Sequence, residues 1–213
     1  MTVLLSSTYF GPIQWYQKLY RYDKILIEQH DSFIKQTYRN RCTIATPNGP
    51  LSLTVPVKLS AKDETYGTPD FNKSSAMISD HGNWRHVHLN ALKSAYGESP
   101  FFEYYIDDIL PFFDKGKWDC LYDYNLEICK KMCELLDIQP DISLTDHYIS
   151  ADEAKAAGID DFRDAIRPKH PLPDESFSPR RYYQVYEQRH GFIQNMSILD
   201  LLFNMGNESI LWL

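Results

Sequence analysis

The sequence has few glycines and lacks the glycine-rich motifs of three large enzyme classes. Its nine glycines form neither the G-x-G-x-x-G pattern of dinucleotide-binding folds nor the G-x-x-x-x-G-K-[ST] phosphate loop. The G-x-S-x-G elbow, which carries the nucleophile of α/β-hydrolases, is also absent. These absences argue against a Rossmann site, a P-loop and a serine-elbow hydrolase, and we predict that the protein uses no cofactor.

Long apolar runs and an excess of positive charge are missing as well. No run approaches the roughly 18 apolar residues that a membrane-spanning helix needs, and the N-terminus lacks the pattern of a signal peptide. The 213 residues carry a net charge of −7, which disfavours electrostatic binding to nucleic acid. We therefore expect a cytoplasmic protein whose partner is a small molecule, with no nucleic acid and no membrane span. Its four cysteines should be reduced, since a chain of this length can bury a core without bridges.

The N-terminal segment has the pattern of a parallel strand-helix-strand unit. A strand is predicted over 3–7, followed by a helix that begins near Pro12 and ends near Tyr20. Residues 24–28 form a short apolar run between charges, as in a strand that is covered on both faces. A helical crossover makes consecutive strands parallel, so this unit predicts an α/β core.

The middle of the chain has the pattern of an antiparallel hairpin followed by helices. Apolar and polar side chains alternate over 51–58, and Asn48-Gly49 is a strong hairpin signal, so this strand should pair with one over 37–46. The predicted fold class is α/β, with a mixed sheet, an N-terminal parallel crossover, an antiparallel hairpin and a helical middle segment. The three helices of that segment should cover 84–96, 100–113 and 118–136.

The last third of the chain is predicted to combine a long loop with one clear helix. Four prolines within twelve positions exclude a helix or a central strand there. We expect one domain over residues 1–213, with a proline-rich excursion at about 139–179. Ser197 and Asp200 stand at capping-box spacing before an apolar helix, and Gly206 is placed to end that helix. Weaker strand patterns occur at 142–149 and 182–186.

The densest group of polar side chains follows the second predicted strand. Glu28, His30 and Asp31 leave its carboxyl end, which is where ligands of open α/β sheets bind. A cationic stripe there would suit phosphate or carboxylate groups. The alternative is a solvated edge hairpin, on which the same charges discourage edge pairing. If residues 35–43 are extended, every second side chain forms that stripe: Lys35, Thr37, Arg39, Arg41 and Thr43.

His30 is the candidate acid-base residue, because a neighbouring carboxylate can orient an imidazole for proton transfer. A partly exposed histidine at a strand end is an equally simple interpretation. No metal site is predicted, since His86 and His88 point about 200° apart on the predicted helix and cannot share one ion. The first loop, residues 6–12, occupies the place where strand-loop-helix nucleotide binders hold phosphate, but it lacks the paired histidines of nucleotidyltransferases.

Several segments along the chain form a recognisable combination: residues 9–12, Lys35 with 39–41, residues 53–57, Trp84 with Tyr96, Ser99-Pro100, and residues 197–206. Taken together, these segments resemble the WbqC-like family of bacterial proteins. The resemblance implies a role in O-antigen or other surface-polysaccharide biosynthesis, with amide or amino-acyl transfer to a sugar acid as its reaction. The sequence departs from the family at two places: Ser7-Thr8 precede Tyr9 where the family commonly has Gln-Pro, and Gln29-His30 replaces its usual acidic pair.

The leading hypothesis is a transferase that acts on an activated or anionic sugar, such as a nucleotide sugar, or on an acyl donor. In this hypothesis His30 moves the proton with the help of Glu28 or Asp31. Two alternatives are a non-catalytic glycan-binding or assembly protein and a nucleotide binder with an anion at the helix that begins near Pro12. The expected substrate-binding residues are Tyr9, Lys35, Arg39, Asn40 and Arg41.

Overall fold

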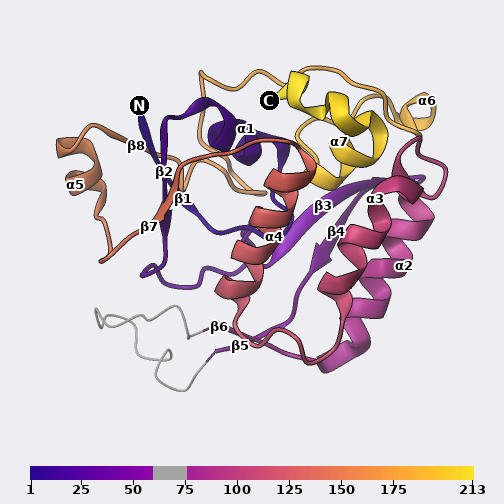
Figure 1. The fold of residues 1–213 in the computed structure, drawn as a ribbon, viewed down its shortest axis with the longest axis horizontal. Coiled ribbons are helices and arrows are strands. Elements are labelled where there is room, and N and C mark those ends of the chain that lie inside the picture. The colour runs from indigo at the N-terminus through magenta and orange to yellow at the C-terminus, as the bar shows by residue number, and fades with distance from the viewer. Residues whose placement is uncertain (60–75) are drawn as a thin grey trace.

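The computed structural model describes residues 1–59 and 76–213, and its N-terminal unit forms as predicted. β1 (Thr2–Ser6) is followed by α1 (Ile13–Arg21) and β2 (Lys24–Glu28), and the two strands pair in parallel. Nearly all of the apolar side chains of both strands are buried, as a strand covered on both faces requires. In Figure 1 this sheet stands at the left, and the hairpin and the longer helices occupy the right.

Two short strands from the proline-interrupted stretch complete the sheet. β7 (Ile142–Leu144) pairs with β2 and β8 (Ile159–Asp161) pairs with β1, both in parallel, which gives the strand order β7-β2-β1-β8. The stretch 139–179 is therefore more than a surface excursion, although its proline-rich part, 168–179, contains no helix or strand. The strand predicted over 142–149 is real but only three residues long. Since the chain first runs outward to β7 and then returns to the other side of β1, the strand order reverses beside β1.

The predicted hairpin is present, but it forms a sheet of its own. β3 (Arg41–Thr46) and β4 (Gly49–Thr54) are antiparallel, with Cys42 opposite Leu53. The first strand thus begins at Arg41 rather than at residue 37, because the chain turns at residues 35–36 and Gln36 has a positive φ of 63°. The fold class is confirmed, with the parallel and antiparallel parts in separate sheets.

The second hairpin strand is shorter than predicted as well. The chain leaves the hairpin at Val55-Pro56, and a proline in a ladder cannot donate a hydrogen bond. The strand predicted over 51–58 is therefore divided into β4 and β5 (Val57–Leu59), and β5 pairs with β6 (Ala76–Ile78).

The predicted helices lie close to their expected positions. No helix in the described part of the chain is long and apolar enough to cross a membrane. The strand predicted at 182–186 is wrong, because this segment contacts the core through the side chains of Tyr182 and Gln184 rather than through a strand ladder. The longer helices are α2 (Trp84–Tyr96), α3 (Phe102–Ile109), α4 (Leu121–Leu135) and α7 (Ile198–Met205). The shorter ones are η2 (His81–Asn83), η3 (Leu110–Phe113), α5 (Ala151–Ala156), α6 (Glu187–His190) and η4 (Gly206–Trp212).

One hydrophobic cluster joins the sheet, the hairpin and the helices. It includes Val3 of β1, Ile44 of β3, Leu92 of α2, Ile128 of α4 and Leu201 of α7, all with no exposed surface. A smaller cluster, in which Leu4 of β1 meets α5, buries the other face of the sheet. The parallel sheet is thus covered on both faces, and its carboxyl edge stays available for polar side chains.

The start of α7 is held by two different polar contacts. The Ser197 hydroxyl caps the helix by accepting from the Leu199 backbone N–H at 3.3 Å, one residue before the Asp200 N–H that a capping box uses. The Asp200 carboxylate does not reach back to Ser197. It is fully buried and accepts from the hydroxyls of Tyr96 (2.7 Å) and Tyr182, and burial raises the pKa of Asp200. Ser197 is therefore the N-cap, as predicted, but the capping box does not form, and its acidic residue anchors the core instead.

Candidate active site

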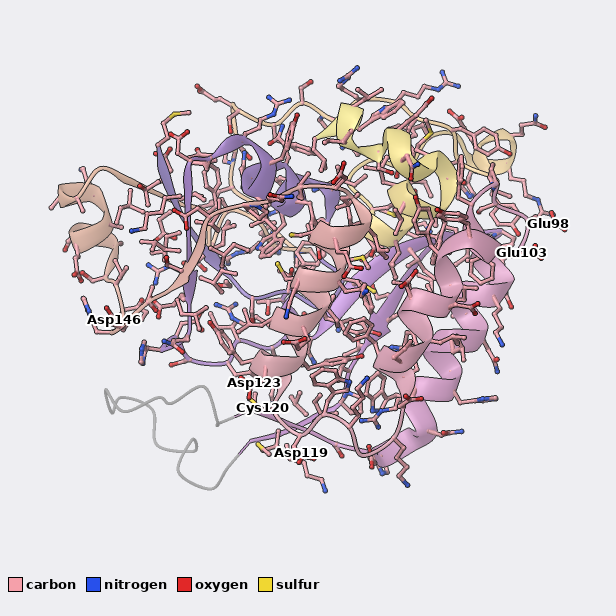
Figure 2. All side chains as sticks on the ribbon, in the orientation of Figure 1. Glu98, Glu103, Asp119, Cys120, Asp123 and Asp146 are labelled. Atoms are coloured by element: carbon pink, nitrogen blue, oxygen red, sulfur yellow. The ribbon has the colours of Figure 1, made fainter. Side chains whose placement is uncertain are left out.

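Polar side chains gather at the carboxyl ends of the parallel strands. All four strands run the same way, so their ends meet along one edge, where Ser6, Glu28, Thr145 and Asp161 follow or end the strands. Figure 2 shows Asp146, just beyond β7, at this lower edge of the sheet. Ligands of open α/β sheets bind at this edge where the strand order reverses, which here is beside β1.

A cleft of about 410 Å³ opens at this edge, and we call it the strand-end cleft. Its volume lies within the range of small-molecule sites, about 300–1,000 Å³. Three predicted site residues, His30, Asp31 and Arg39, line it together, and Glu28 lies behind its wall. Its lining consists of His30, Asp31, Ser32, Ile34, Arg39, Tyr148, Ala151, Asp161, Arg163 and Asp164.

Glu28 is a buried carboxylate that fastens the strand-end segments together. Its Oε1 accepts from the His30 backbone N–H and the Thr145 hydroxyl, both at 2.8 Å. Its Oε2 accepts from the Ile149 backbone N–H at 3.0 Å and from Arg163 Nη1 at 3.1 Å. Only 1% of Glu28 is exposed, so it holds the cleft in shape and does not reach a ligand.

Arg39 is oriented into the cleft by Asp31 and Ser6. Its Nη2 donates to the Asp31 carboxylate and, at 2.7 Å, to the Ser6 hydroxyl, which itself donates to Asp31 at 3.2 Å. Asn125 of α4 fixes the Arg39 backbone by donating to its carbonyl oxygen at 2.7 Å. Arg39 Nε has no hydrogen-bond partner among residues 1–59 and 76–213. That nitrogen is itself buried and does not face the cleft, so Nη1, which donates to no group in the described part of the chain, is the donor left for an oxyanion.

The ring of His30 is positioned so that one nitrogen can act as a base. Nε2 lies 3.1 Å from the Thr145 carbonyl oxygen. A carbonyl oxygen can only accept, so Nε2 carries the hydrogen and Nδ1 of the neutral ring keeps its lone pair. This is the tautomer that a general base at Nδ1 requires.

Arg163 is a site residue that the sequence analysis missed. Its Nε and Nη2 form a fork on Asp161 at 2.9 and 2.6 Å, and its guanidinium carbon lies 5.2 Å from the centre of the Tyr148 ring. Each arginine of the cleft is thus paired with a carboxylate, and the predicted purely cationic stripe is wrong. The sequence did not predict β8, and Asp161 and Arg163 are recognisable as strand-end residues only once that strand is known.

Three predicted substrate-binding residues lie away from the strand-end cleft. Arg41 donates from Nε to the Thr54 hydroxyl at 3.1 Å across the hairpin, and Lys35 is exposed on the turn before it. Asn40 is buried and donates to the Val55 carbonyl oxygen at 2.8 Å. The turn at Gln36 separates these side chains, because residues 35–40 are not extended.

Tyr9 is a core residue. It has no exposed surface, its ring stacks on Tyr124, and its hydroxyl donates to His88 Nδ1 at 2.9 Å. It therefore cannot orient an acceptor in the strand-end cleft.

We expect His88 to make the protein sensitive to acid. Burial lowers the pKa of His88 to about 4, although a hydrogen bond to the Thr54 backbone opposes this. The unfolded chain takes up a proton near pH 6.5 and the folded one does so only near pH 4, so stability falls as the pH falls through this window. The loss between pH 7 and pH 5 should be about 2 kcal/mol. Urea unfolding at the two pH values measures it.

The matched variants are His88→Gln, which should flatten this pH dependence, and His86→Gln, which removes an exposed histidine of the same helix and should preserve it. An unchanged slope in His88→Gln would assign the acid sensitivity to another group.

The N-terminus of α1 is already occupied by protein groups. The Ile13 backbone N–H donates to the Met196 carbonyl oxygen at 3.0 Å, and the Gln14 backbone N–H donates to Asn195 Oδ1 at 2.9 Å. The expected anion site near Pro12 is therefore filled by the chain itself. Among residues 1–59 and 76–213, no group of three or more histidine, cysteine or acidic side chains could hold a metal ion, and Cys42, Cys129 and Cys133 are buried free thiols.

Comparisons with known proteins support the family resemblance. The chain is 22% identical to "Uncharacterized protein Rv1507c" of Mycobacterium tuberculosis (strain ATCC 25618 / H37Rv), over 97% of this chain and 94% of that protein. No solved structure gives a significant match. The sequence profile of the WbqC-like protein family matches residues 6–170, which include every residue that lines the strand-end cleft. The chain therefore belongs to the WbqC-like protein family.

Proposed function

We propose that the protein is a transferase that binds an activated or acidic sugar in the strand-end cleft. The observation that carries this proposal is that His30, with Nδ1 free to accept a proton, and Arg39, whose Nη1 donates to no group in the described part of the chain, line the same cleft. The strand-end cleft lies at the edge of the parallel sheet where the strand order reverses, and this position supports a ligand site. The resemblance to proteins of surface-polysaccharide biosynthesis favours a sugar as the substrate.

The proposed chemistry is acyl transfer to an amine or a hydroxyl. Arg39 binds the phosphate or carboxylate of the sugar, and Asp31 keeps the guanidinium in place. The attacking nitrogen or oxygen bonds to the acyl carbon while His30 Nδ1 takes its proton, and the leaving group departs with the electron pair of the broken bond. Glu28 and Arg163 act as positioning residues, because they hold the segments that carry His30 and line the cleft.

Arg39→Gln is expected to weaken the binding of an acidic sugar at least tenfold. The variant loses the charge that would pair with the phosphate or carboxylate, and a charge-assisted hydrogen bond is worth about 1.5–3 kcal/mol. Isothermal titration with glucuronic acid, galacturonic acid and a uridine-diphosphate sugar measures the effect. Arg41→Gln is the control. Arg41 lies on the hairpin, away from the strand-end cleft, so this variant should bind the acidic sugar as the native protein does.

Equal affinities for the two folded variants, or no binding by the native protein, would refute the role of Arg39. Circular dichroism verifies that both variants fold.

A non-catalytic sugar-binding protein is the second candidate. Tyr148 favours it, because its ring lines the cleft, is half exposed and could stack on a sugar. Turnover of a bound substrate decides between the two. The transferase requires product from the native protein and about a hundredfold less from His30→Gln, whereas the binding protein gives no product with either.

A further inference from the structure

A second cleft of about 440 Å³ lies beside α1 and the start of the hairpin. One side comes from Tyr38 and Thr43, and the other from the proline-rich segment that begins at Arg167. Residues 194–196, just before α7, close the end. This second cleft contains none of the residues that line the strand-end cleft.

The two clefts lie on either side of the Tyr38-Arg39 segment, because Tyr38 lines the second cleft and Arg39 lines the strand-end cleft. A small pocket of about 10 Å³ shares Tyr38 with the second cleft and Arg39 and Arg163 with the strand-end cleft. This volume holds about one water molecule, since a water needs roughly 10–15 Å³. The shared lining places the two clefts next to each other at Tyr38 and Arg39.

The charged groups of the second cleft are already paired. Asp174 accepts from Lys18 Nζ at 2.6 Å, and both side chains are at least 96% buried. Arg167, at the start of the same proline-rich segment, pairs with Asp164. A charged ligand would therefore have to compete with an existing ion pair, so the cleft favours a neutral one.

Uncharged polar groups and apolar side chains share the remaining lining. The Tyr38 and Thr43 hydroxyls and the Gln194 side-chain amide have no hydrogen-bond partner in the part of the chain that the structure describes. Each of these groups can both donate and accept. Beside them, Phe177 and the 56% exposed Leu172 offer apolar contact surface.

We propose that the second cleft binds a neutral, hydroxyl-rich molecule of the saccharide type. The hydroxyls of a saccharide both donate and accept, which matches the free groups of the cleft, and its C–H faces pack on aromatic and aliphatic side chains. Saccharide binding follows from the lining alone. The further assignment of this saccharide as the acceptor rests on the proposed transferase function and on the position of the two clefts, which adjoin at Tyr38 and Arg39.

The binding test uses a panel of neutral mono- and disaccharides, including glucose, galactose and N-acetylglucosamine, titrated into the ¹⁵N-labelled protein. We expect chemical-shift changes at the backbone amides of Tyr38, Thr43 and Gln194. The double variant Thr43→Val/Gln194→Leu should weaken binding at least tenfold, because two hydrogen bonds are lost. Gln188→Leu makes the same change on the exposed surface of α6 and should bind as the native protein does.

The outcomes separate this inference from the proposed function. Absence of binding by the whole panel, or equal affinities of the double variant and Gln188→Leu, would overturn the saccharide site. Arg39→Gln should leave neutral saccharide binding intact, just as the double variant should leave acidic-sugar binding intact. Loss of acidic-sugar binding in both variants would show that the two clefts are a single site.

Discussion

Replacing Gly206 by alanine is expected to destabilise the protein by about 2 to 5 kcal/mol. Gly206 ends α7 with φ 58° and ψ −134°, a backbone conformation that side-chain-bearing residues avoid. An added Cβ would also lie 2.6 Å from the Phe101 ring. The Phe101 backbone is held by its N–H, which donates to the Phe203 carbonyl oxygen at 3.0 Å, so the clash can be relieved only by turning the Phe101 side chain away from its present position. Urea unfolding with linear extrapolation measures the loss.

Gly158→Ala is the comparison variant, because it places a Cβ at a positive φ without a side-chain clash. Gly158 also has a positive φ, 66°, but an added Cβ there meets no atom within 4 Å, so we expect a loss of about 1 kcal/mol. The double variant Gly206→Ala/Phe101→Ala should lose less than the sum of its two single variants, because the clash is absent. Equal losses at Gly206 and Gly158 would contradict the predicted contact with Phe101.

The sequence predicts those parts of the fold in which local patterns and tertiary packing agree. The unit from β1 to β2 has the apolar runs of buried strands, and Gly206 stands where α7 must stop. β8 offers no such pattern, because its three residues are Ile159, Asp160 and Asp161. It is an edge strand only because its backbone pairs with β1. Such a pairing between distant segments leaves no periodic pattern in three residues.

The sequence likewise predicts one part of the candidate site correctly and another part incorrectly. Glu28, His30 and Asp31 follow directly from the end of a recognisable strand, and the structure places them at the cleft. The stripe prediction assumed an extended chain before Arg41, and the turn at Gln36 breaks it. Two of the five residues of the intended stripe nevertheless reach the clefts, since Arg39 lines the strand-end cleft and Thr43 the second one.

Glu28→Gln is expected to cost about 3 to 5 kcal/mol of stability, even though the two side chains have nearly the same shape. Both carboxylate oxygens of Glu28 accept two hydrogen bonds each, and an amide nitrogen cannot accept. Whichever way the amide turned, its N–H groups would face two donors, and Arg163 would lose a charged partner within the protein interior. Chemical denaturation of the variant gives the free energy of unfolding.

Glu98→Gln is the matched control, because Figure 2 shows Glu98 at the right-hand edge of the molecule, far from the cleft, and its side chain is exposed. Its stability should change by less than about 0.5 kcal/mol. The comparison also tests the role of Glu28. If Glu28 is a positioning residue, Glu28→Gln should lose stability and ligand binding together, since the His30 backbone loses its anchor and Arg163 keeps only its fork on Asp161. A Glu28→Gln variant as stable as the native protein, with normal binding but no turnover, would instead make Glu28 a proton-transferring group.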